Sequence, residues 1–157
     1  MTSAPAGSLW PYALDVYGRP GVEPLMLALQ DQHGQCVPFL LWSLWMAAGG
    51  RPIEAAPAAA CAELARAWQD AAVAPLRRLR RDLRAKARSQ RIEARVREGV
   101  KALELEAERM LLQMLEEASP APTAAPGERL AALRAAVRAW GGQAPAALLE
   151  ALAALAA

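Results

Sequence analysis

The 157-residue sequence has little of the chemistry that metal centres and redox sites use. It contains one histidine and two cysteines, Cys36 and Cys61, which lie far apart and form no CxxC pair. A single histidine excludes a His-rich metal cluster. Two thiols in an apolar chain are more often buried and reduced than paired, although a disulfide stays formally open. We therefore expect no metal site and no cofactor.

β-branched residues are also scarce. Val, Ile and Thr number 7, 2 and 2, or 7 + 2 + 2 = 11 in all, which is too few for a sheet-rich protein. Alanine and leucine dominate instead, and the length suits one domain with a sizeable core. The composition predicts an all-α protein, a bundle of about six or seven helices.

Familiar catalytic motifs and targeting segments are missing as well. The sequence has no P-loop, GxGxxG, HExxH or GxSxG pattern, so we assign no catalytic residue. The N-terminal MTSAPAGS has neither the basic region nor the hydrophobic core of a signal peptide. We expect a cytoplasmic protein, with residues 1–7 as a disordered leader.

What the chain does have is one run that is apolar on nearly all sides, Val37–Ala48. Its twelve residues would span roughly 18 Å as a helix, too short for the ~30 Å core of a bilayer, so no transmembrane segment is expected. We interpret it as a buried central helix around which the bundle packs, with Pro38 in its first turn. Core packing is also the favoured interpretation of Trp42 and Trp45, which share one face.

Amphipathic helices and one proline-rich linker fill the rest of the chain. Pro75 is expected to kink one helix or to start the next, and Ser89 is a weak break before a long bundle-like helix. The expected helices are Leu9–Tyr17, Val22–His33, Val37–Ala48, Ala58–Ala74, one from Leu76, one from Ile92 to about Ala118, and two shorter ones. The expected divisions are a helical domain at 8–118, a linker at 119–127 and a C-terminal helical pair at 128–157.

Charged residues are segregated along the sequence. Residues 77–97 hold ten Arg or Lys and two acids, 10 − 2 = +8, whereas residues 98–117 hold two bases and six Glu, 2 − 6 = −4. A turn at Ser89 would give an antiparallel hairpin with Arg80 near Val96, and one continuous helix would keep acids and bases apart. In both cases we expect a basic pole that its own hairpin leaves uncovered. The candidate partner contacts are Arg77, Arg78, Arg80, Arg81, Arg84, Arg88, Arg91 and Arg95.

An exposed basic pole suits an acidic protein, a nucleic acid backbone or an anionic lipid surface, and a solvated face is the plain alternative. No aromatic residue is interleaved with the arginines, which disfavours stacking on single strands. The preferred hypothesis is a non-enzymatic interaction or regulatory protein that binds an acidic protein or a nucleic acid backbone. The long helix or the C-terminal helices would also serve a homo-oligomer.

A polar cluster near residue 30 supports an alternative hypothesis, a small-ligand binder or an enzyme. Asp31 and His33 could form a base couple, but a histidine before a helix-ending glycine more often caps the helix. No nucleophile is identified beside them. The pocket would lie between the first three helices and be lined by Trp10, Tyr17, Gln30, Asp31, His33, Trp42 and Trp45.

Several of these short patterns together resemble a known family. They are Leu9-Trp10, Ala13-Leu14, Tyr17-x-Arg19-Pro20-Gly21-Val22, Leu27-x-Leu29-Gln30-Asp31-x-His33-Gly34 and Pro75-Leu76-Arg77-x-x-Arg80-Arg81. The chain is similar over roughly 8–117 to an uncharacterised bacterial family of unknown function. The resemblance implies a helical, cytosolic, proteobacterial-type protein and no particular reaction. Pro38 departs from the family pattern, where a polar residue is expected.

Overall fold

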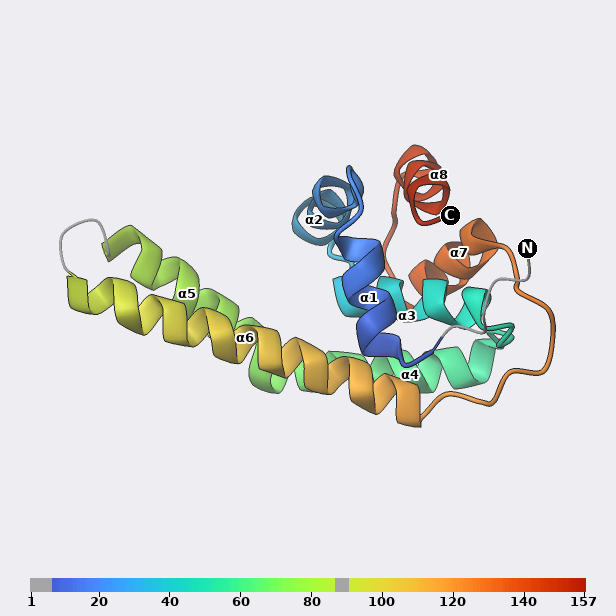
Figure 1. Ribbon diagram of the computed structural model, residues 1–157, viewed down its shortest axis with the longest axis horizontal. Helices are drawn as coiled ribbons and strands as arrows, with labels where there is room; N and C mark the ends of the chain where they lie inside the picture. The colour runs from blue at the N-terminus through green and yellow to red at the C-terminus, as the bar shows by residue number, and fades with distance from the viewer. Residues whose placement is uncertain (1–6, 87–90) are drawn as a thin grey trace.

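The computed structural model describes residues 7–86 and 91–157, apart from the side chains of 91–93, and these residues form helices with no strand among them (Figure 1). The predicted all-α fold class is confirmed. None of the helices in these ranges is long and apolar enough to cross a membrane. The elements are α1 (Leu9–Tyr17), α2 (Val22–His33), α3 (Val37–Ala48), α4 (Ala55–Trp68), the π-helical turn η1 (Gln69–Val73), α5 (Ala74–Lys86), α6 (Arg91–Glu117), α7 (Arg129–Trp140) and α8 (Ala146–Leu155).

Helix α3 lies at the centre of the fold, where α1, α2, α6 and α7 pack around it. Pro38 occupies its first turn, where the missing N–H leaves no helical hydrogen bond unmade. Trp42 is 1% exposed, and its indole N–H donates to Ser119 Oγ at 2.8 Å. Trp45 is 2% exposed and donates to the Gly7 carbonyl at 2.7 Å. Both indoles are therefore core side chains whose polar group has a partner.

The two C-terminal helices share this core. Helix α7 packs against α3 and α4, and α8 packs against α2 and α7. The connection from α6 to α7 is hydrogen-bonded to the end of α3, because Ala124 N–H donates to the Gly50 carbonyl and Gly127 N–H donates to the Ala47 carbonyl. Gly50 has a φ of 64°, and a Cβ there would lie 2.0 Å from the Ala124 carbonyl oxygen. Only glycine fits this position.

A π-helical turn joins α4 to α5 and accommodates Pro75. In a regular α-helix the proline ring would meet the carbonyl of Ala71, four residues earlier. The turn η1 widens the helix immediately before α5, so α4 ends at Trp68 rather than at the expected Ala74.

Helices α5 and α6 form a hairpin that projects from the rest of the molecule (Figure 1). Leu111 and Leu115 of α6 are fully buried and fix its base to the core. Trp68 adds a hydrogen bond there, since its indole N–H donates to the Ala107 carbonyl at 2.8 Å. Helix α5, all of which the structure describes, has no buried residue. The hairpin is thus anchored through α6 and open along α5.

Candidate interaction surfaces

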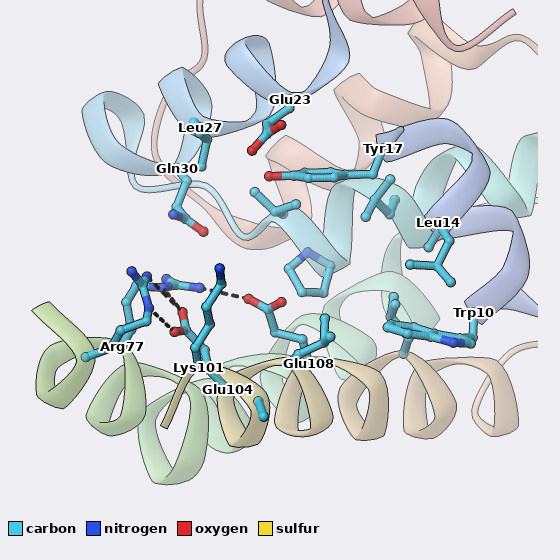
Figure 2. Close-up of a pocket in the computed structure, with 18 of the residues that line it drawn as sticks. Trp10, Leu14, Tyr17, Glu23, Leu27, Gln30, Arg77, Lys101, Glu104 and Glu108 are labelled. Atoms are coloured by element: carbon cyan, nitrogen blue, oxygen red, sulfur yellow. Dashed lines mark hydrogen bonds and ion pairs between the residues drawn. The ribbon is translucent and has the colours of Figure 1, made fainter. Parts of the chain in front are cut away.

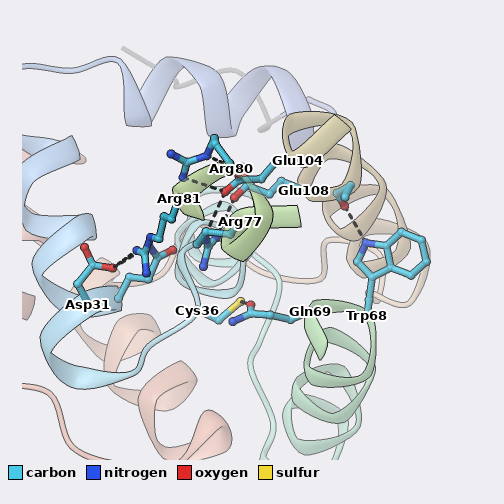
Figure 3. A network of polar contacts seen from close by, with 11 residues as sticks. Asp31, Cys36, Trp68, Gln69, Arg77, Arg80, Arg81, Glu104 and Glu108 are labelled. Carbon is cyan, nitrogen blue, oxygen red and sulfur yellow. Dashed lines mark hydrogen bonds and ion pairs between the residues drawn. The ribbon is translucent and has the colours of Figure 1, made fainter. Parts of the chain in front are cut away.

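Two arginines of α5 are tied to two glutamates of α6 near the base of the hairpin (Figure 3). Arg77 Nε lies 3.1 Å from Glu104 Oε1, and its Nη2 lies 3.1 Å from Glu108 Oε1. Arg80 also donates to the Glu104 carboxylate, through both Nε and Nη2. Because Glu104 is only 7% exposed, these charges interact with little screening by water.

The two glutamates respond differently to this environment. Burial by itself would raise the pKa of Glu104, but hydrogen bonds from Arg80 and Arg77 outweigh it and hold the pKa below the ordinary value. For Glu108 burial dominates and raises the pKa, with Arg77 offsetting only part of the effect. The same contact raises the pKa of Arg80, because its charged form donates to Glu104. Glu104 is therefore the charged centre of the cluster.

The expectation that the hairpin leaves its arginines uncovered is wrong for Arg77 and Arg80. Arg80 reaches Glu104 rather than lying near Val96, so the pairing brings the basic helix alongside the acidic half of α6. The sequence signals for the turn at Ser89 are weak, so they do not fix how the two helices align. A long arginine side chain can also reach a residue of the partner helix that is not directly opposite. These two residues stabilise the hairpin, whatever else they bind.

A third arginine joins the hairpin to the body. Arg81 Nη2 lies 3.4 Å from Asp31 Oδ1 of α2, and both side chains are about half exposed. Asp31 also accepts a hydrogen bond from Gln30 at 3.2 Å. An exposed pair of this kind contributes little to stability, typically about 0.2–1 kcal/mol.

The outer arginines of the hairpin remain open to solvent. Arg78, Arg84 and Arg95 are exposed, and none of them pairs with an acid within the ranges that the structure describes. Arg88 and the side chain of Arg91, which belong to the same predicted set, lie outside the described residues. Arg84 and Arg95 thus lie exposed toward the tip of the hairpin, and Arg78 lies exposed nearer its base.

A groove of about 610 Å³ separates the hairpin from α1 and α2 (Figure 2). Trp10 and Tyr17 of α1 and Gln30 of α2 line one wall, as the alternative hypothesis placed them. Lys101 and Leu105 belong to the α6 wall. Burial raises the pKa of Tyr17 to about 12, so its hydroxyl stays protonated and can donate a hydrogen bond. The groove is amphipathic, with an apolar end at Trp10 and a charged end at the arginine–glutamate cluster.

The other residues predicted for a pocket lie elsewhere. Trp42 and Trp45 are inside the core, as described above. Asp31 faces Arg81. His33 ends α2, and Gly34 follows with a φ of 62° as the C-cap. The structure thus brings three of the seven predicted pocket residues together and separates the remaining four.

The residues that α6 contributes to the arginine–glutamate cluster and to the groove were not predicted from the sequence. Glu104 and Glu108 are four residues apart, and Arg77 and Arg80 are three apart, so each pair shares a helix face. Matching these two spacings across a hairpin was the available signal. It needed the register of the hairpin, which local patterns do not supply.

The fold and these surfaces define an all-helical protein with a projecting charged hairpin. Residues 8–115 match the sequence pattern of the family described as "Protein of unknown function (DUF2390)", and the chain belongs to that family. The resemblance to a family of unknown function is therefore confirmed. No curated protein and no solved structure matches the chain significantly.

Proposed function

We propose that this protein is a non-enzymatic interaction protein whose hairpin docks on an acidic protein partner. The observation that carries the proposal is that three cations, Arg78, Arg84 and Arg95, are exposed on an element that projects from the body. A positive surface on a projecting element meets an anionic partner early and accelerates its association. Arg77 and Arg80 already bind glutamates of α6, so we leave them out of the set of partner-binding residues that the sequence predicted.

The side chains beside these cations favour a protein over a nucleic acid. Leu79 on α5, next to Arg78 in the sequence, is 46% exposed, so apolar surface lies on the same element as the charge. Residues 74–118 contain no aromatic side chain on which a base could stack. An acidic segment with apolar residues would satisfy both features, whereas a phosphate backbone would leave the leucine uncovered.

The proposal is tested by binding to two defined anionic probes. A labelled glutamate-rich peptide with interspersed leucines should bind the wild-type protein at low salt, and the affinity should fall at least ~10-fold in ~0.5 M salt. Arg84→Glu with Arg95→Glu should abolish the low-salt binding. The same double reversal on α7, at the exposed Arg134 and Arg138, changes the net charge equally and is the matched control that should leave the binding unchanged.

A labelled DNA duplex in the same assay separates the two partner classes. If the duplex binds and the peptide does not, the partner is a nucleic acid. If neither probe binds, or the α7 control behaves like the hairpin variant, the hairpin is a solvated structural element.

The groove supports a second candidate function, ligand binding. Its volume of about 610 Å³ lies within the usual range for small-molecule sites of roughly 300–1,000 Å³. An amphipathic fluorescent anion, anilinonaphthalene sulfonate, should bind there with its aromatic body near Trp10 and its sulfonate near Lys101. Leu105→Asp should weaken this binding, and Met110→Asp on another face of α6 should not. Equal effects of the two variants would exclude the groove as the binding site.

A further inference from the structure

One face of α6 carries three apolar side chains that the described part of the chain leaves about half exposed. Val96, Leu103 and Met110 are 51%, 58% and 44% exposed. They are spaced seven residues apart, so they lie along one face of the helix. Val100 and Ala107 of the same helix are buried against the rest of the molecule. Val96, Leu103 and Met110 therefore form the exposed edge of the same apolar stripe whose other edge, Val100 and Ala107, the fold buries.

Gly99 lies on the same exposed face, three residues after Val96 and four before Leu103. A Cβ added there would meet no atom within 4 Å, so nothing inside the described chain requires a glycine. Glycine in a helix interior costs about 1 kcal/mol relative to alanine. A missing side chain on an exposed helix face allows a second backbone to approach closely. Gly99 therefore leaves room on this face for a second helix.

We infer that this face pairs with the same face of a second copy of the chain. We call it the outer seam, defined by Val96, Gly99, Leu103 and Met110. The pairing is antiparallel and two-fold symmetric, with Leu103 of each copy at the axis. Val96 of one copy then packs against Met110 of the other. The inference goes beyond the proposed function, because it assigns a different surface and a different partner.

The distribution of charge along α6 favours a second copy of the chain as the partner of this face, and it favours antiparallel pairing of the two helices. Its first part, 91–101, holds four bases and two acids, 4 − 2 = +2. Its second part, 102–117, holds one base and five acids, but Glu104 and Glu108 already bind arginines of α5, which leaves 1 − 3 = −2. Antiparallel pairing places the positive part of each copy beside the negative part of the other. Parallel pairing would place like charges together. Helix α6 is thus complementary to itself in one orientation only.

The outer seam is separate from the groove. The groove is lined by other residues of α6, including Lys101, Leu105 and Leu112, and by no member of the seam. A second copy on the seam therefore leaves the groove open, and the two surfaces can be tested one at a time.

Cysteine cross-linking tests the predicted symmetry. Leu103→Cys should form an intermolecular disulfide on mild oxidation, because the two Cys side chains meet at the axis. Val96→Cys alone should not, since the two copies of residue 96 would be about 21 Å apart, whereas Val96→Cys with Met110→Cys should cross-link. The native Cys36 and Cys61 are buried, and the wild type is the background control. Efficient cross-linking of Val96→Cys alone would overturn the antiparallel pairing.

Sedimentation equilibrium tests the seam itself. The wild type should dimerise reversibly, and Leu103→Glu should raise the dissociation constant at least ~10-fold by placing two carboxylates at the axis. Leu105→Glu, an equally exposed leucine of α6 on the groove side, should leave the dimer intact. A wild type that stays monomeric, or a Leu103→Glu variant that still dimerises, would overturn the inference. Neither result would bear on binding of the acidic peptide by Arg84 and Arg95.

Discussion

At the scale of single residues, Glu104 determines which arginines of the hairpin are bound within the protein. Its carboxylate accepts hydrogen bonds from both Arg77 and Arg80, and it is almost fully buried. A buried carboxylate with two such donors stabilises the fold, whereas the same carboxylate without them would destabilise it. This cluster engages Arg77 and Arg80 and leaves Arg78, Arg84 and Arg95 exposed.

The first prediction concerns the pH dependence of stability. Because the pKa of Glu104 is lowered in the folded protein from the ordinary 4.5, the unfolded chain takes up this proton at a higher pH. The stabilisation is therefore complete above about pH 4.5 and is lost as the pH falls through the folded-state pKa. Glu104→Gln should lower the free energy of unfolding by about 1.5–3 kcal/mol at pH 7, and less at pH 3.

Urea denaturation at the two pH values measures this effect. Glu106→Gln, on an exposed carboxylate of the same helix, should change the free energy of unfolding by less than about 0.5 kcal/mol at either pH. An equal loss for both variants at pH 7 would contradict the role assigned to Glu104.

The second prediction concerns the cysteines. Burial raises the pKa of the Cys36 thiol to about 12, and the thiol donates a hydrogen bond to Gln69 Oε1 at 2.9 Å. Burial also raises the pKa of Cys61. Neither thiol should react with iodoacetamide at pH 8 in the folded protein, because the thiolate is the nucleophile. Mass spectrometry should show alkylation only after addition of denaturant, and rapid labelling of native protein would contradict this.

The third prediction concerns the connection between α6 and α7. Gly50→Ala would force an alanine into a φ of 64° and against the Ala124 carbonyl, so it should destabilise the protein by at least ~2 kcal/mol. Gly127→Ala is the control, since its added Cβ would meet only ordinary van der Waals contacts. Thermal unfolding of both variants checks the difference. Similar melting temperatures would mean that the connection is not held against α3.

At the scale of elements, α6 takes part in several different surfaces at once. It contributes core side chains at its C-terminal end, one wall of the groove, the acids that bind α5, and the outer seam. Such a helix has distinct faces, and substitutions on them should have separable effects.

The fourth prediction uses two of these faces. Leu111→Ala should cost about 2–5 kcal/mol, because the side chain is fully buried beside α3. Leu105→Ala should cost less than about 1 kcal/mol, because half of that side chain is exposed in the groove. Chemical denaturation measures both values, and equal costs would mean that the two faces are not distinct.

At the scale of the whole molecule, most helices could be predicted from the sequence, but the contacts between them could not. Helical spacing predicted α1, α2 and α3 to the residue, and the apolar run at Val37–Ala48 indicated its own burial. Such signals are local. The pairing of Arg80 with Glu104, and the groove between Trp10 and Leu105, join residues distant in the sequence, and no local pattern fixes how such helices align. The region before Pro75 was predicted in part. The proline indicated that the helix is interrupted there, but it did not indicate that the interruption is a π-helical turn.

Docking of the hairpin on an acidic partner is tested by NMR chemical-shift mapping of the isotope-labelled protein with the glutamate-rich peptide at low salt. The account predicts perturbed amide signals that cluster on the hairpin around Arg78, Arg84 and Arg95 and disappear in ~0.5 M salt. Perturbations that cluster around Trp10 and Leu105 in the groove, or none on the hairpin around these arginines, would contradict it.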